Sequence, residues 1–223
     1  MFFLLNVLAF IGNLIICPIA AGILLRQWYN SDRRFLTDMP FLLGLSFISA
    51  FIDNIDSTVG FIFNFQQNIY SGILSASVMI TILAFMLIII TDLLFEEKSK
   101  KIRYVVVFIF VILIELLAII LILIDLHVIF VMFVNICLAL PTTIAFAFTF
   151  IQCYRQERLP NINPLYIGIG FTIYSSSWII KTIMFATLEP ISYVFPAWIF
   201  IGYFLDIIAY LIAIYGFTHK APY

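Results

Sequence analysis

The sequence predicts an all-α integral membrane protein with seven transmembrane helices, built as two parallel three-helix repeats joined by a linker helix. Three observations lead to this prediction. The 223-residue chain is 65% hydrophobic and 10% charged, with a mean hydropathy of +1.18, whereas soluble domains carry about 25% charged residues. Seven apolar spans are long enough to cross a bilayer. A stretch of the second span is echoed in the sixth.

The apolar spans are joined by short connections, none of which has room for a folded soluble domain. We therefore expect one membrane domain over residues 1–223. Its first repeat covers about 2–95, its linker helix about 104–124 and its second repeat about 128–217. The predicted spans cover approximately residues 2–25, 40–63, 72–95, 104–124, 128–152, 164–187 and 193–217.

The N-terminal span opens with MFFLLNVLAF, which has no basic n-region and is not followed by a small-residue cleavage site. We expect a permanent helix here rather than a removable signal peptide. Asn13 and Pro18 of this span are echoed by Asn135 and Pro141 of the fifth. This weaker echo favours the same repeat.

The second and sixth spans carry the clearest echo. A shift of 124 residues places Pro40 on Pro164, and several further identities follow. The two spans cross the bilayer in the same direction, so the repeat is parallel, with an axis along the membrane normal. The fourth span is uniformly apolar apart from Glu115, as a lipid-facing linker would be. The other matching pairs are Gly44 with Gly168, Phe47 with Phe171, Ile55 with Ile179, Thr58 with Thr182 and Phe61 with Phe185.

The basic residues predict the orientation. Ten of the eleven follow the first, third, fifth or seventh span, whereas the connections at 64–71, 125–127 and 188–192 contain no Lys or Arg. By the positive-inside rule, the N-terminus lies outside and the C-terminus in the cytoplasm, which predicts a multi-pass protein of the cell membrane. The ten residues are Arg26, Arg33, Arg34, Lys98, Lys100, Lys101, Arg103, Arg155, Arg158 and Lys220.

Ionisable residues inside the spans mark the candidate site. Asp53 and Asp56 share one face of the second helix, and a carboxylate at a helix centre costs about 2.5–3.5 kcal/mol on insertion scales. Lys181, the one lysine inside a span, shares a helix face with Tyr174 and Ser177. We expect an aspartate of the second span to neutralise Lys181 near mid-membrane, although the same residues could serve only helix packing.

The predicted site therefore lies between the second and sixth spans. Asp206 of the seventh span could complete it, or could form a local packing hydrogen bond. The residues expected to bind a small molecule or ion are Asp53, Asp56, Ser57, Tyr174, Ser177, Lys181 and Asp206.

Patterns typical of enzymes and metal sites are missing from the sequence. Both histidines, His127 and His219, lie at span ends, and there is no H-E-x-x-H, no G-x-S-x-G and no glycine-rich phosphate loop. The three cysteines have no C-x-x-C spacing. We therefore expect no enzyme activity, metal or cofactor. The net charge of −1 gives no support to nucleic-acid binding.

The chain resembles the sugar-transporting SWEET (MtN3/saliva) family in architecture, which is built as three plus one plus three helices with the N-terminus outside. Three strings carry the resemblance: Gly12-Asn13 with Pro18, Met39-Pro40-Phe41, and the Ser175–Ile180 run SSSWII. The third and seventh spans lack the Pro-Asn pair of that family. The resemblance implies transport by two three-helix bundles.

The sequence as a whole predicts a small-solute or ion-coupled transporter. Two alternatives stay open: a seven-helix ligand-sensing, receptor-like protein, and a structural membrane subunit of a larger complex. The expected partners are the lipid bilayer and a small-molecule or ion ligand, with no nucleic acid. A homo-oligomer or a membrane protein partner stays open as well.

Overall fold

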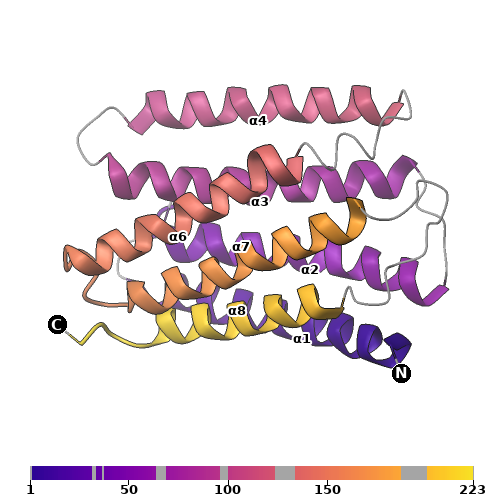
Figure 1. Cartoon of the computed structure of the whole chain (residues 1–223). Coiled ribbons are helices and arrows are strands. Elements are labelled where there is room, and N and C mark those ends of the chain that lie inside the picture. The colour runs from indigo at the N-terminus through magenta and orange to yellow at the C-terminus, as the bar shows by residue number, and fades with distance from the viewer. Residues whose placement is uncertain are drawn as a thin grey trace.

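The computed structural model describes residues 2–31, 34–36, 38–63, 69–95, 100–123, 134–186 and 200–222, and every regular element within them is a helix. A single π-helical segment, η1, leads directly into α6 (Figure 1). The elements are α1 (Phe2–Tyr29), α2 (Met39–Phe63), α3 (Ile69–Leu94), α4 (Lys100–Leu123), η1 (Val134–Ala139), α6 (Leu140–Arg155), α7 (Pro164–Ala186) and α8 (Phe200–Thr218).

Six helices in the described part are long and apolar enough to cross a membrane, which makes the chain a multi-pass membrane protein. They are α1, α2, α3, α4, the η1–α6 unit and α8. Every predicted span corresponds to a helix, but α7, the sixth, is not among these six. The polar run Ser175–Ser177 and Lys181 lower its hydropathy. The α7 helix packs between α6 and α8 and keeps one exposed face, which includes Ile169, Ile179 and Ile183.

Six of the helices form a closed ring. Following neighbours around it, α1 packs on α2, α2 on α3, α3 on α6, α6 on α7, α7 on α8, and α8 back on α1. Successive helices run up and down, so the N- and C-termini lie at opposite ends of the bundle (Figure 1). The ends of α1 and α8 that lie near the C-terminus are tied by a hydrogen bond from Gln27 Nε2 to the Phe217 carbonyl, 2.9 Å long.

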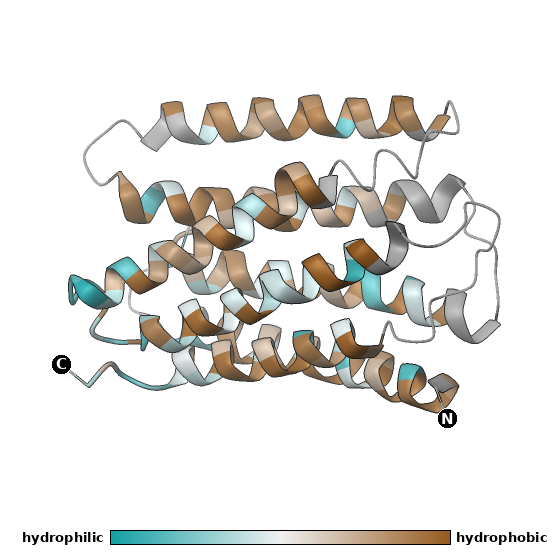
Figure 2. Ribbon diagram, in the orientation of Figure 1, coloured by the Kyte–Doolittle hydropathy of each residue, from teal (hydrophilic) through white to brown (hydrophobic). Residues whose placement is uncertain are grey.

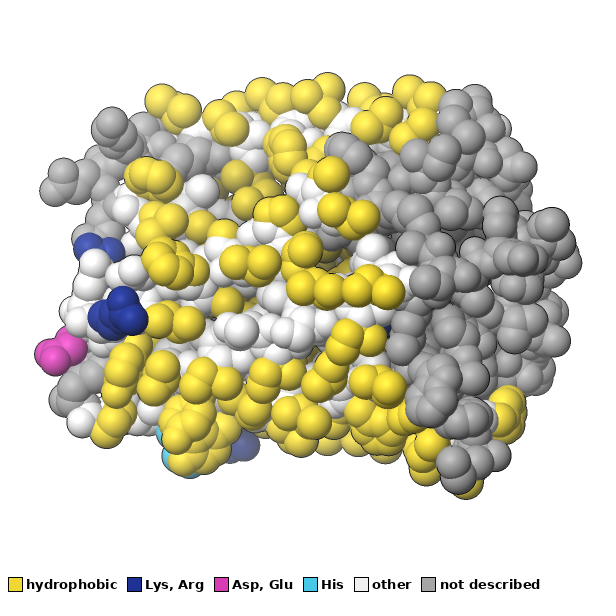
Figure 3. Space-filling view, in the orientation of Figure 1, with side chains coloured by type: hydrophobic (Ala, Val, Ile, Leu, Met, Phe, Trp, Pro, Cys, Tyr) yellow, Lys and Arg dark blue, Asp and Glu magenta, His cyan; other side chains and the backbone are white. Residues whose placement is uncertain are grey.

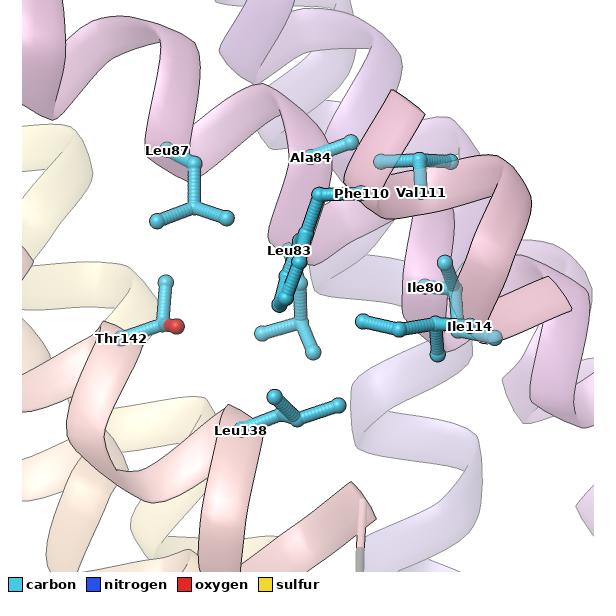
Figure 4. Close-up of a pocket in the computed structure, with 9 residues that line it drawn as sticks. All are labelled: Ile80, Leu83, Ala84, Leu87, Phe110, Val111, Ile114, Leu138 and Thr142. Atoms are coloured by element: carbon cyan, nitrogen blue, oxygen red, sulfur yellow. The ribbon is translucent and has the colours of Figure 1, made fainter. Parts of the chain in front are cut away.

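The fourth helix, α4, stands outside the ring and packs against α3. Of its apolar stretch Tyr104–Leu121, only 11% is buried. An apolar crevice remains where α4, α3 and the η1–α6 unit meet. Figure 4 shows its lining, in which Leu83, Ile114 and Leu138 approach one another and Thr142 supplies the one hydroxyl. The exposed side chains of α4 are mostly apolar, and its role as a linker between two repeats stays a prediction.

Side chains are sorted along the bundle. On the face shown in Figure 3, hydrophobic side chains cover the middle, and Lys and Arg gather toward the end where the C-terminus lies. The exposed Arg155 and Arg158 at the end of α6, and Lys220 after α8, belong to this end. The segregation predicted from the sequence is therefore kept among the described residues.

Two helical units on opposite sides of the ring contain a proline away from their ends. Pro18 lies inside α1, and Pro141 lies at the start of α6, directly after the π-helical segment and so within the η1–α6 unit. A proline has no N–H, so the carbonyl four residues before it loses its helical hydrogen bond. In α1 that carbonyl belongs to Leu14.

Candidate binding site inside the helix ring

Lys181 of α7 and Asp206 of α8 form an ion pair within the bundle. The Lys181 ammonium donates a hydrogen bond to Asp206 Oδ2, and the two side chains are 12% and 5% exposed. The prediction that an aspartate of α2 pairs with this lysine was wrong. The physical reason is the ring order, because α7 packs directly against α8, whereas α2 lies across the ring from α7.

The lysine is held by the helix it reaches. Gly202 provides the space for its stem, since a Cβ on Gly202 would lie 2.7 Å from Lys181 Cγ. The ammonium lies 4.2 Å from the centre of the Tyr203 ring, a cation–π contact. Ser177 donates to the Gly202 carbonyl at 2.8 Å and so fixes α7 against α8 at this level.

The first helix reaches the same region from the other side of α8. Asn13 is fully buried, and its Nδ2 donates to the carbonyls of Ala9 (3.0 Å) and Tyr203 (2.9 Å). One turn further along α1, Cys17 lies within electrostatic range of Asp206. The Cys17 thiol accepts a long hydrogen bond of 3.7 Å from Asn54 of α2.

The second helix adds the predicted polar face. Ser57 lies beside the Tyr203 hydroxyl, and Asp53 lies within electrostatic range of the same tyrosine. Asp53 and Asp56 are both half-buried. Figure 2 shows hydrophilic stretches of α2 and α7 at the same level along the bundle, in the half toward the N-terminus. Four helices, α1, α2, α7 and α8, thus contribute to one polar region.

We call this region the central polar cluster. Its only positive charge is that of Lys181, and its residues come from both halves of the chain. The members are Asn13, Cys17, Asp53, Asn54, Ser57, Ser177, Lys181, Tyr203 and Asp206.

A layer of aromatic side chains closes the bundle on the C-terminal side of the cluster. Tyr210 packs on Phe47 with ring centres 5.0 Å apart and on Tyr174 at 5.3 Å. Phe171 packs on Tyr174 at 6.1 Å. Together with Met86 they line a cavity with room for about one water molecule. The helices therefore meet tightly here, and this aromatic layer separates the cluster from the basic end.

Most of the predicted site residues come together. Asp53, Ser57, Ser177, Lys181 and Asp206 belong to the cluster. Tyr174, which the sequence also predicts for the site, lies in the aromatic layer next to it. Asp56 is on the same helix face as Asp53, and nothing in the described part of the chain gives it a hydrogen bond or ion pair.

Sequence reasoning missed Asn13 as a contact of the site, and it missed Tyr203 and Gly202 entirely. Tyr203 lies one helical turn before Asp206, so an i, i+3 search from that aspartate could have found it. The glycine carries no such signal, because its role depends on how closely α7 approaches α8. No three His, Cys, Asp or Glu side chains gather as metal ligands among the residues that the structure describes.

Comparisons of the chain with protein-family models, with curated proteins and with solved structures found no match.

Proposed function

We propose that this chain carries a small solute or ion across the membrane by rocking two three-helix halves about the central polar cluster. The halves are α1–α3 and the η1–α6 unit with α7 and α8, and α4 connects them. In this proposal the N-terminus lies outside and the C-terminus in the cytoplasm, because basic residues collect at the C-terminal end. The single observation that carries the proposal is a polar cluster enclosed by helices from both halves.

The order of helices in the ring supports two equivalent halves. Replacing α1, α2 and α3 by α6, α7 and α8 turns the α1–α2 contact into α6–α7, and α2–α3 into α7–α8. The contact between the halves, α3–α6, becomes α8–α1, which also exists. A two-fold axis along the membrane normal produces such a pattern, and parallel repeats of this kind occur in transporters.

The aromatic layer supports the same relation. The 124-residue shift that relates Pro40 to Pro164 also relates Phe47 to Phe171, and both line one small cavity. The same shift relates Met86 to Tyr210, and these too face that cavity. Equivalent positions thus meet at the centre of the ring, where a two-fold axis would pass.

The charges do not follow this symmetry. The 124-residue shift places Lys181 on Ser57 and Asp206 on Ile82, so the ion pair has no counterpart in the first half. Ionisable residues buried in a membrane mark ion or substrate paths by default. The ion pair lies in the second half alone, while the first half contributes the carboxylates of Asp53 and Asp56, so the two halves of the proposed carrier hold different charges.

Uptake into proteoliposomes tests the proposal. Vesicles containing the wild-type chain are offered labelled sugars, amino acids, nucleosides and monovalent cations, beside vesicles without protein. We expect flux of one class, a loss of at least tenfold in Asp206→Asn, and unchanged flux in Glu157→Gln. Glu157 is an exposed carboxylate of the loop after α6 and serves as the matched control. Flux that is absent for every compound, or unaffected by Asp206→Asn, would contradict the proposal.

A ligand-sensing, receptor-like function is the second candidate, because the helices leave room for only about one water molecule beside the cluster. A sensor needs no path through the bundle. It would be stabilised by its ligand without any flux. A structural subunit, the third candidate, would show neither flux nor ligand stabilisation and would co-purify with a defined membrane partner.

A further inference from the structure

We infer that Asn13 Oδ1 and Asp206 Oδ1 form part of a binding site for a monovalent cation between α1 and α8. This inference deepens the proposed function by naming an ion for the central polar cluster, but its test measures binding and not transport. Both oxygens are buried acceptors that receive no hydrogen bond from the described residues. Asn13 is 0% and Asp206 4% exposed.

The orientation of the Asn13 amide is fixed by its surroundings. Its Nδ2 faces two carbonyl oxygens, those of Ala9 and Tyr203. A flipped amide would place an acceptor against two acceptors, so Oδ1 must be the atom without a partner. A buried acceptor left without a hydrogen bond destabilises the protein, and a ligand with positive charge or donors would recover that loss.

The two oxygens belong to one helix interface. The Asn13–Tyr203 and Gln27–Phe217 hydrogen bonds each join residues 190 positions apart, so α1 and α8 run parallel with a constant offset. Asp206 follows Tyr203 by about one turn and therefore shares its helix face. Lys181 bonds to Oδ2 of Asp206, and the nearby Ser177 hydroxyl donates to the Gly202 carbonyl, which leaves Oδ1 for a second positive partner.

The charge balance selects the class of ligand. Lys181 is paired with Asp206, and the facing helix α2 adds the carboxylates of Asp53 and Asp56, so these helices carry more acidic than basic side chains at this level. This balance favours a partner that carries positive charge over a neutral donor. An amide and a carboxylate oxygen are hard ligands that suit an alkali cation such as Na⁺. Transition metals prefer His and Cys, and no three His, Cys, Asp or Glu side chains are placed to hold a metal ion together among the described residues.

A third acceptor extends the site toward the end of the bundle where the N-terminus lies. Asn6 is 3% exposed, and its Oδ1 also receives no hydrogen bond from the described residues. Asn6 and Asn13 lie seven positions apart, which places them on the same face of α1 about two turns from each other. A cation entering from that end would meet these oxygens in succession.

The test measures the thermal unfolding of the purified full chain in lipid nanodiscs, with NaCl, KCl, LiCl or choline chloride at equal ionic strength. We expect the Tm to rise with Na⁺ concentration relative to choline, by about 5–10 °C at a hundredfold excess over Kd. Equilibrium binding of radioactive Na⁺ to the wild type gives an independent measurement that does not depend on any variant.

Substitutions at the proposed site test where the ion binds. The double substitution Lys181→Met with Asp206→Asn removes both charges while keeping similar side-chain volumes, and Asn13→Ala removes the amide acceptor. We expect the double variant to lose the Na⁺ response and Asn13→Ala to weaken it at least tenfold in Kd. Asn163→Ala is the matched control, because Asn163 carries another buried acceptor without a partner, at the opposite end of the bundle.

Four outcomes would overturn the inference. They are an equal Tm in Na⁺ and choline, an equal rise with every salt, stabilisation by lower pH alone without any Na⁺ effect, and a Na⁺ response retained by both variants. The last two would identify a proton or a different location. Na⁺ binding without flux would leave this site standing and refute the transporter, whereas flux without Na⁺ binding would do the reverse.

Discussion

Breaking the Lys181–Asp206 pair from either side should destabilise the protein far more than removing both charges together. Both side chains are nearly enclosed, at 12% and 5% exposure. Removing one partner of such a pair leaves an uncompensated charge inside the bundle, which costs about 3–5 kcal/mol. Lys181→Met should destabilise the protein by an amount at the upper end of this range, because the remaining Asp206 carboxylate is buried away from water. Asp206→Asn should fall at the lower end, because the lysine keeps its contact with the Tyr203 ring.

The double variant Lys181→Met with Asp206→Asn should lose no more free energy of unfolding than the more damaging single variant. This corresponds to a coupling energy of about 3 kcal/mol between the two side chains. The assay is reversible unfolding of the four proteins in mixed micelles of detergent and denaturing SDS, followed by far-UV circular dichroism. Glu157→Gln should change stability by less than about 0.5 kcal/mol. A double variant whose loss equals the sum of the two single losses would refute the coupled pair.

Three further predictions concern close approaches and orientation. Gly202→Ala should lower the free energy of unfolding by about 1–3 kcal/mol, because the new methyl group displaces the Lys181 stem. Gly22→Ala is the control, because nothing lies within 4 Å of its new Cβ, and it should be neutral or slightly stabilising. The same unfolding assay measures both variants. Gly170→Ala should be worse than Gly202→Ala, because its Cβ would lie 2.7 Å from a backbone carbonyl of α8 that cannot rotate away, and a Gly170→Ala protein at least as stable as Gly202→Ala would contradict this. Lys220→Cys should react with a membrane-impermeant maleimide only after the cells are opened, and labelling of intact cells would reverse the proposed orientation.

The helices could be predicted from hydropathy because each apolar run has the length that a bilayer requires. Predicted and observed bounds agree within a few residues for α2 and α7, where prolines mark the start. They differ most at the starts of the fifth and seventh spans, which the sequence begins at about 128 and 193 and whose described helices begin at Val134 and Phe200. Residues 128–133 and 193–199 lie outside the described part of the chain.

The partner of Lys181 could not be predicted, because helical periodicity tells which residues share a face but not which helix that face meets. The 124-residue echo placed Lys181 opposite the α2 aspartates, and that reasoning assumed that equivalent helices touch. In the ring, α2 and α7 face each other across the centre, and the helix that packs directly beside α7 is α8. Asp206 had been considered only as an addition to the site. Packing between neighbours, set by residues as small as Gly202, decided the pairing.

The two prolines inside the ring helices have a consequence for how its shape can change. An unbroken helix resists bending through every hydrogen bond along its length, and a proline removes one of them in advance. Pro18 in α1 and Pro141 after the π-helical segment occupy helices that face each other across the ring. Bending at these two positions would change the distance between α1 and α6 while the other ring helices stayed straight. The two prolines thus favour deformation of the ring along the line that joins α1 and α6.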